Sequence, residues 1–289
     1  MHLLCRGTGA AILFIHGMPT SSQLWRGIVD RMCGQFTCFA IDLPGLGKTP
    51  PELYGPDYLH RMAKRIDALR VENRIRRWHV VGHDAGSAIA AHYTHSFQEH
   101  VGSLALLSPA LFPDLKPYCL LACLRRPVIG ECLAPLVNAI FWKVAMRLAA
   151  RNEEETETAN STLPHFYEPF SGFAGGWAFM LVLRWGKPSD ILAHIPGMLP
   201  RIVVPTLIFQ GLRDPAIPAS FARRAHELIP NCELVYINCG HFIPLNKPGV
   251  IADRLLRFFD ESIDTGGMAR PIGHGSDGRQ QAVAFVRNG

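Results

Sequence analysis

Short apolar runs, each ending at loop-forming residues, recur along the chain. They cover residues 10–15, 36–41, 78–81, 104–107, 206–209 and 233–237. Runs of this length without polar alternation are typical of parallel strands that are buried on both faces. Helix-like stretches lie between them, so the pattern predicts an α/β fold with a mostly parallel sheet flanked by helices. In such a fold, ligands bind beyond the carboxyl ends of the strands.

The strand pattern stops between residues 107 and 201, where residues 120–150 have a mostly helical pattern. We therefore predict a helical cap over 112–199, inserted into a core made of 1–111 and 200–262. A cap at that point would close a pocket over the strand ends. From residue 263 to 289, Gly, Asp, Arg and Gln dominate without periodicity, which predicts a loose C-terminal tail.

Composition narrows the class of protein. Hydrophobic residues make up 48% and charged residues 18% of the 289 positions, which excludes a mainly disordered chain. The net charge of +5 is spread over short arginine groups, so we expect no nucleic acid partner. The scattered cysteines form no C-x-x-C pair and no apolar leader precedes the first run, which favours a cytoplasmic protein. No run approaches the ~20 apolar residues of a membrane span, so we expect no membrane association.

The third apolar run ends in a Gly-x-Asp-x-Gly sequence, formed by Gly82, Asp84 and Gly86. This spacing is typical of a nucleophile elbow, a sharp strand-to-helix turn that lifts one side chain above the sheet. The side chain lifted here is a carboxylate, and the N-terminus of the following helix favours an anion there. A simple helix N-cap is the alternative role for Asp84.

Two further candidate residues follow later strands. Asp214 comes after the run 206–209, and His241 comes after the run 233–237. Both should lie at the same rim of the sheet as Asp84. The chain order of nucleophile, acid and histidine is that of the α/β-hydrolase triad.

Four stretches, together with this order, carry a family resemblance: residues 16–22, 42–48, 82–86 and 239–242. Over about residues 10–261 the chain resembles the α/β hydrolases with an aspartate nucleophile, which include epoxide hydrolases and haloalkane dehalogenases. The resemblance implies the α/β-hydrolase fold and a metal-free, cofactor-independent hydrolase. It also places the oxyanion hole at the backbone N–H groups of Met18 and Ala85.

A carboxylate nucleophile suits attack on saturated carbon, because the product is an ordinary ester on Asp84. His241 would then activate the water that hydrolyses this ester, and Asp214 would orient the imidazole. His83, next to the nucleophile, is expected to be a packed, hydrogen-bonded histidine without a catalytic role. For the Met18–Pro19 peptide bond, the general preference is trans, with cis as the alternative.

The resemblance leaves the substrate open. Dehalogenases of this family hold the halide with side-chain N–H donors, usually at the positions that are Met18 and Ala85 here, and neither side chain has a donor. Trp177 or Trp185 would have to replace them, although pocket or core packing is the commoner role for such residues. Epoxide hydrolases use cap tyrosines, for which Tyr118 and Tyr167 are the candidates, again with packing as the alternative role. The second expected tyrosine position is occupied by the Phe179 region.

We therefore expect an epoxide hydrolase that gives diols, with haloalkane dehalogenase as the alternative. A carboxylesterase ranks lower, because a carboxylate attacking an ester would form a mixed anhydride. A non-catalytic ligand-binding protein of the same fold is a further alternative. The cap is rich in Leu, Phe, Trp and Met, so the expected partner is a small, largely apolar organic substrate. The sequence makes no prediction about oligomeric state.

Overall fold

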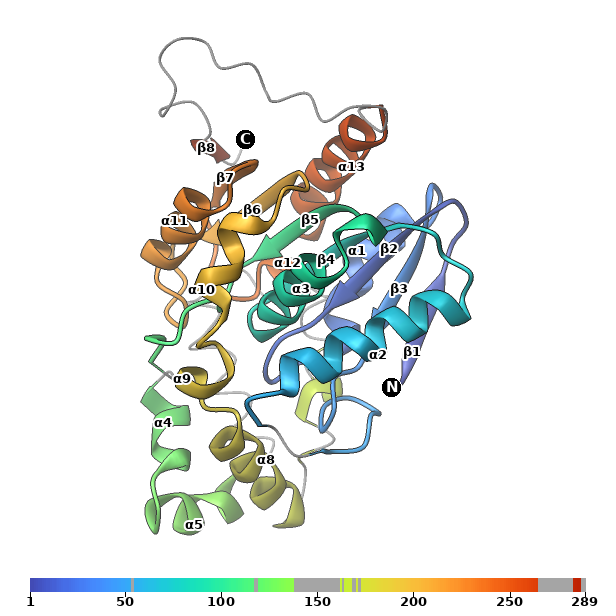
Figure 1. The fold of residues 1–289 in the computed structure, drawn as a ribbon. Helices are drawn as coiled ribbons and strands as arrows, with labels where there is room; N and C mark the ends of the chain where they lie inside the picture. The colour runs from blue at the N-terminus through green and yellow to red at the C-terminus, as the bar shows by residue number, and fades with distance from the viewer. Residues whose placement is uncertain are drawn as a thin grey trace.

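The chain folds around one mixed β-sheet covered by helices on both faces (Figure 1). The structure is a computed structural model and describes residues 1–52, 55–116, 119–137, 162, 164–167, 170, 173–264 and 283–286. The strand order is β1-β3-β2-β4-β5-β6-β7-β8. The strands are β1 (Leu3–Arg6), β2 (Ala10–Ile15), β3 (Phe36–Ile41), β4 (Trp78–His83), β5 (Val101–Leu107), β6 (Thr206–Gly211), β7 (Cys232–Ile237) and β8 (Val283–Val286).

Each of the six apolar runs falls on one of the parallel strands β2 to β7, so the predicted fold class is confirmed. These strands are buried almost throughout, as expected for a sheet covered on both faces. Among the strands that the structure describes, the one antiparallel pairing joins β1 to β3, with Leu3 opposite Ile41. The first residues of the chain therefore form the edge strand of the sheet.

The far edge of the sheet differs from the sequence prediction of a loose tail over 263–289. Helix α13 (Pro248–Asp264) reaches into this range, and β8 pairs with β7 in parallel, with Leu234 opposite Val283. Strand pairing uses backbone hydrogen bonds, which a composition without periodicity does not reveal. The rest of the range lies outside the described residues.

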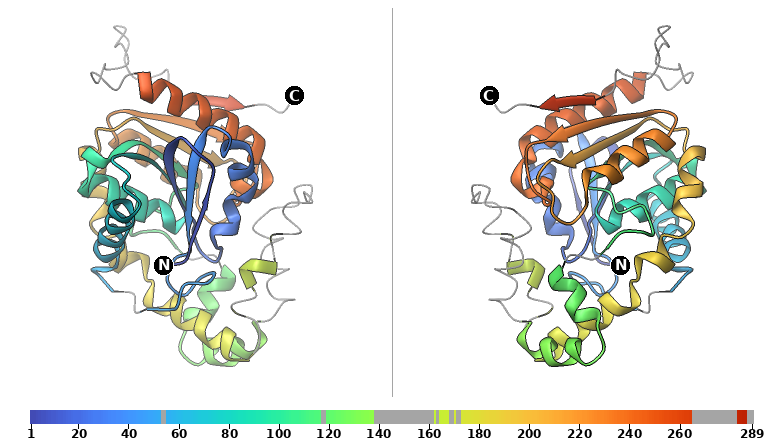
Figure 2. Two further views of the ribbon diagram at one scale, coloured as in Figure 1. Left: turned by 90° about the vertical axis from the view of Figure 1, so that its right-hand side faces the viewer. Right: turned by 90° about the vertical axis from the view of Figure 1, so that its left-hand side faces the viewer.

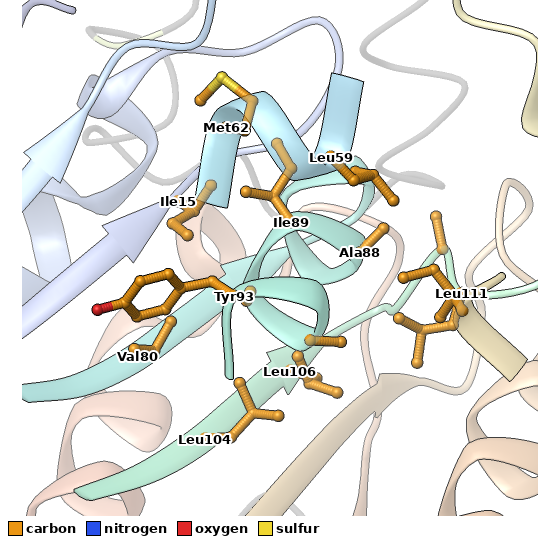
Figure 3. Packing of buried hydrophobic residues seen from close by; sticks show 14 of the residues in the cluster. Ile15, Leu59, Met62, Val80, Ala88, Ile89, Tyr93, Leu104, Leu106 and Leu111 are labelled. Carbon is orange, nitrogen blue, oxygen red and sulfur yellow. The ribbon is translucent and has the colours of Figure 1, made fainter. Parts of the chain in front are cut away.

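Helices pack on both faces of the sheet (Figures 1 and 2), and an apolar layer lies between the helices and the sheet on each face. One layer packs α2 (Tyr58–Glu72), α3 (Ala85–Ser96) and α11 (Ala219–Leu228) onto the sheet. Figure 3 shows part of it, with Ile89 of α3 beside Met62 and Leu59 of α2, and Tyr93 beside Val80. The other layer packs α1 (Arg26–Met32), α12 (Ile243–Asn246) and α13. The 3-10 turns of the core are Ser22–Trp25, Gln98–His100 and Leu199–Arg201.

The described part of the segment between β5 and β6 is mostly helical. It contains α4 (Cys119–Arg125), α5 (Ile129–Leu133), a 3-10 turn (Ala134–Leu136), α8 (Phe173–Trp185), α9 (Pro188–Ile191) and α10 (Ile195–Met198). Helices α4, α5 and α8 gather at one end of the molecule (Figure 1). Arg184 of α8 binds both carboxylate oxygens of Glu131 and the carbonyl of Arg126, which fastens α8 to the corner between α4 and α5.

A polar network joins β4, α2 and α3 on the face of the sheet that α2 and α3 cover. The indole N–H of Trp78 donates to the hydroxyl of Tyr93 (3.2 Å), which donates to Asp67 (3.3 Å). Arg70 donates to the same carboxylate (2.7 Å) and to the carbonyl of Ile75. These bonds satisfy groups that would be costly to bury alone. Within the described ranges, no helix is long and apolar enough to cross a membrane.

Candidate active site

Asp84 occupies the turn between β4 and α3. Its backbone has φ 50° and ψ −122°, a strained conformation for a residue with a side chain. A Cβ on Gly82 would lie 2.7 Å from the carbonyl oxygen of Gly86, and a Cβ on Gly86 would lie 2.4 Å from the carbonyl oxygen of His16. The two glycines are therefore required by close backbone approach, as the Gly-x-Asp-x-Gly spacing predicts.

The Asp84 carboxylate is held by backbone donors. The N–H of Met18 donates to Oδ2 (2.9 Å), and the N–H of Ala85 also bonds to the carboxylate. Gly17 has no room for a side chain, since its Cβ would lie 2.6 Å from Oδ2. Burial raises the pKa of Asp84, against the opposing effects of His241 and the two N–H donors. The two residues expected to form an oxyanion hole thus both bring their N–H groups to the Asp84 carboxylate, with that of Met18 on Oδ2.

Asp214 lies beyond the end of β6, and its side chain is fully buried. The N–H groups of Ala216 and Ile217 donate to Oδ1 at 2.8 and 2.9 Å. Burial would raise the pKa of Asp214, but the charge and hydrogen bond of His241 and the backbone donor outweigh it, so the pKa is lowered. Asp214 is therefore a fixed negative charge.

His241 lies between the two carboxylates. Its Nδ1 is 2.9 Å from Asp214 Oδ2, and its Nε2 is 3.9 Å from Asp84 Oδ1. Burial would lower the pKa of the imidazole, but Asp214 and then Asp84 outweigh it and raise the pKa to about 9. The structure thus brings together the three residues that the sequence places after β4, β6 and β7.

The loop that carries Met18 is fixed by a second histidine that sequence analysis did not single out. The N–H of Leu43 donates to His16 Nε2 (2.9 Å), so the ring proton lies on Nδ1, which bonds to the carbonyl of Gly17 (2.9 Å). Burial lowers the pKa of His16 to about 4, which keeps it neutral. The Met18–Pro19 peptide bond is cis, unlike the general preference. In the sequence, only the place of His16 directly before Gly17 indicates that it fixes the Met18 loop.

The four cap candidates are placed to different extents. Tyr118 lies outside the described residues, and Trp185 is described only as the last residue of α8. Tyr167 is half-buried and packs against the apolar layer that includes α2, α3 and α11, and Trp177 is half-buried in α8. Phe179 is fully buried and packs against Phe170, with ring centroids 5.0 Å apart. The two backbone donors to the Asp84 carboxylate, Met18 and Ala85, belong to the core. Among the described residues, no cluster of three His, Cys, Asp or Glu side chains could hold a metal ion.

The sheet order, the elbow and the site together define the α/β-hydrolase fold. A family described as "alpha/beta hydrolase fold" matches residues 10–126. A loop variant of a haloalkane dehalogenase from Bradyrhizobium elkanii superposes with a TM-score of 0.74 at 20% identity, covering 92% of this chain and 94% of that one. This likeness shows the fold.

Curated relatives cover most of the chain at low identity. A haloalkane dehalogenase from Sphingobium indicum is 29% identical, covering 89% of this chain and 91% of its own length. A soluble epoxide hydrolase from a Corynebacterium species is 26% identical, with 90% and 93% covered. A cis-3-alkyl-4-alkyloxetan-2-one decarboxylase from Shewanella oneidensis is 25% identical, with 91% and 86% covered. The chain is thus similar to enzymes with three different substrates.

Proposed function

We propose that the protein is a hydrolase that forms an alkyl ester on Asp84, and that an epoxide is its substrate. One observation carries the proposal: the two oxygens of the Asp84 carboxylate have different surroundings. Oδ2 accepts the N–H of Met18, whereas Oδ1 faces His241 Nε2 at 3.9 Å. One oxygen is thus held in place while the other is left to react.

In the first step, Oδ1 of Asp84 attacks a saturated ring carbon of the epoxide, and the bond from that carbon to the ring oxygen breaks. The oxygen leaves as an alkoxide that takes up a proton. Tyr167 is the described candidate donor, and Tyr118 is the second candidate. The product is a hydroxyalkyl ester whose carbonyl oxygen is Oδ2.

In the second step, His241 Nε2 takes a proton from a water that attacks Cγ of the ester. The negative charge then develops on Oδ2, which accepts the N–H of Met18, and the N–H of Ala85 beside the carboxylate would be the second donor. Asp214 stabilises the imidazolium through Nδ1. Collapse of the intermediate breaks the bond between Cγ and Oδ1, and Oδ1 leaves as a hydroxyl of the diol with the proton returned by His241. The water oxygen takes the place of Oδ1, and loss of its remaining proton restores the Asp84 carboxylate.

Haloalkane dehalogenation is the second candidate. The relative from Sphingobium indicum and the half-buried position of Trp177 favour it. It ranks below epoxide opening because Met18 and Ala85 offer only backbone N–H groups, which already bind the Asp84 carboxylate. A departing halide would have to be held by the cap alone.

The relative from Shewanella oneidensis suggests a third substrate, a four-membered lactone. Attack of Asp84 on its saturated ring carbon would release a carboxylate, which leaves without a proton donor. Loss of CO₂ from that carboxylate, with return of the C–O bond electrons to Asp84, would give an alkene. The lack of side-chain donors at Met18 and Ala85 is compatible with this route, which would not need His241 as a base.

The test is intact-protein mass spectrometry of His241→Gln with three probes: styrene oxide, 1-bromohexane and a cis-dialkyl oxetan-2-one. We expect styrene oxide to add its full mass to the protein, and Asp84→Ala to remain unlabelled. An alkyl adduct with released bromide would instead favour dehalogenation. Continued alkene release by His241→Gln would favour the lactone route. No adduct and no product with any probe would contradict nucleophilic attack by Asp84.

A further inference from the structure

His83 connects the nucleophile strand to the loop of the candidate base. It is the last residue of β4 and is fully buried. Its Nε2 lies 3.0 Å from the carbonyl oxygen of His241, 158 positions away in the sequence. Strands β5 and β6 lie between β4 and β7, so no backbone ladder joins the two segments. The His83 side chain makes this connection directly.

The carbonyl that His83 contacts is part of a tight turn. It also accepts the N–H of Ile243 (3.0 Å), and Phe242 between them has φ −86° and ψ 60°. These values define an inverse γ-turn. The His83 and His241 rings lie 4.9 Å apart, and the ring of Phe242 lies 5.0 Å from that of His241. The turn that His83 contacts therefore lies directly beside the His241 ring.

The side chain of His83 can donate only one hydrogen bond, because its ring is neutral. Burial, reinforced by the neighbouring positive His241, lowers its pKa to about 3, with Asp214 and His16 as the other titratable groups around it. The neutral ring has one N–H, and a carbonyl partner requires that it be on Nε2. Nδ1 is then a buried acceptor with no hydrogen-bond donor within the described part of the chain. Burial of this unpaired Nδ1 costs free energy of folding, which a side chain without an unpaired acceptor would avoid at position 83.

We propose that His83 is a positioning residue, whose Nε2–H holds the His241 carbonyl so that the His241 ring stays between Asp214 and Asp84. The proposal rests on the proposed function in one respect only, the expected effect on the rates of the two chemical steps. Alkylation of Asp84 does not use His241, whereas hydrolysis of the ester does. Loss of the His83 donor should therefore slow the second step and leave the first step unchanged.

The test compares three substitutions. His83→Gln places an amide N–H₂ near the position of Nε2, His83→Asn places it near that of Nδ1, and His83→Met fills the space without a donor. In rapid-quench experiments with styrene oxide, we expect His83→Asn and His83→Met to alkylate at the wild-type rate. Their ester should be hydrolysed about 10²-fold more slowly, because small displacements of a base are costly. His83→Gln should restore hydrolysis to within a few-fold.

A measurement without substrate keeps this proposal separate from the proposed function. Proton NMR of the His241 Nδ1–H reports its hydrogen bond to Asp214 in each variant. We expect the resonance to be kept in His83→Gln and lost or shifted upfield in His83→Asn and His83→Met. An unchanged resonance in all three variants would overturn the positioning role, as would equal slowing of both chemical steps. Absence of any adduct, with the NMR pattern as expected, would instead reject only the proposed function.

Discussion

His241 Nε2 and Asp84 Oδ1 are 3.9 Å apart, slightly too far for a direct hydrogen bond. At this distance the two groups still interact strongly through their charges, since both are buried. The Asp84 carboxylate thus favours the protonated form of His241 before substrate reacts. An ester on Asp84 carries no charge, so the first chemical step would itself lower the pKa of His241 and leave more of it in the neutral form that can accept a proton.

The first prediction follows from this coupling. Asp84→Asn removes the charge while keeping the shape, so the pKa of His241 should fall below its value of about 9 in the wild type. The measurement is an NMR titration of the imidazole Cε1–H. Asp214→Asn should lower the pKa as well, because Asp214 is the larger of the two raising influences. An unchanged pKa in Asp84→Asn would mean that Asp84 exerts no charge effect at 3.9 Å.

The second prediction concerns stability and pH. The folded pKa of His241 lies above its ordinary 6.5, so folding favours the protonated ring. This stabilisation is fully present below pH 6.5 and is lost as pH rises through about 9. We expect wild type to lose stability relative to His241→Gln across this window, by on the order of a few kcal/mol. Urea unfolding of both proteins from pH 6 to 10 measures it, and parallel curves would contradict the raised pKa.

Gly17→Ala should disturb the nucleophile itself. The added Cβ would lie 2.4 Å from Asp84 Cβ and 2.6 Å from Oδ2, so either Asp84 or the Met18 loop must move. We expect adduct formation with styrene oxide to fall at least tenfold, together with a stability loss of about 1–3 kcal/mol. Gly34→Ala is the matched control, because nothing lies within 4 Å of its Cβ. Similar adduct rates in the two variants would show that the contact is unimportant.

Tyr93→Phe should affect stability without affecting chemistry. It removes the hydroxyl that accepts the Trp78 N–H and donates to Asp67, which leaves a buried indole donor unpaired. We expect a loss of about 1–2 kcal/mol in the free energy of unfolding. A double-mutant cycle with Trp78→Phe isolates the pair, and additive effects would argue against the bond. The rate of adduct formation at Asp84 serves as the functional control.

The strands and the candidate triad could be predicted from sequence because each depends on a local pattern. Buried parallel strands read as apolar runs, and the elbow around Asp84 needs glycines at fixed spacing. Pairing of β8 with β7 has no such pattern, since backbone hydrogen bonds hold it. The contact between His83 and the His241 carbonyl is equally hidden, because it joins β4 to the loop after β7, a strand that does not neighbour β4. Cap positions such as Tyr167 depend on tertiary packing, so sequence left two roles open for it.

The order of strands in the sheet also has a consequence for folding. Asp84 follows β4, whereas Asp214 and His241 follow β6 and β7. Strand β6 can pair with β5 only after the two ends of the long segment between these strands have come together. Parallel pairings over such separations form slowly. Recovery of activity on refolding should therefore lag behind the recovery of helical signal, since helices form from local contacts. Enzyme activity would then report the last stage of sheet assembly.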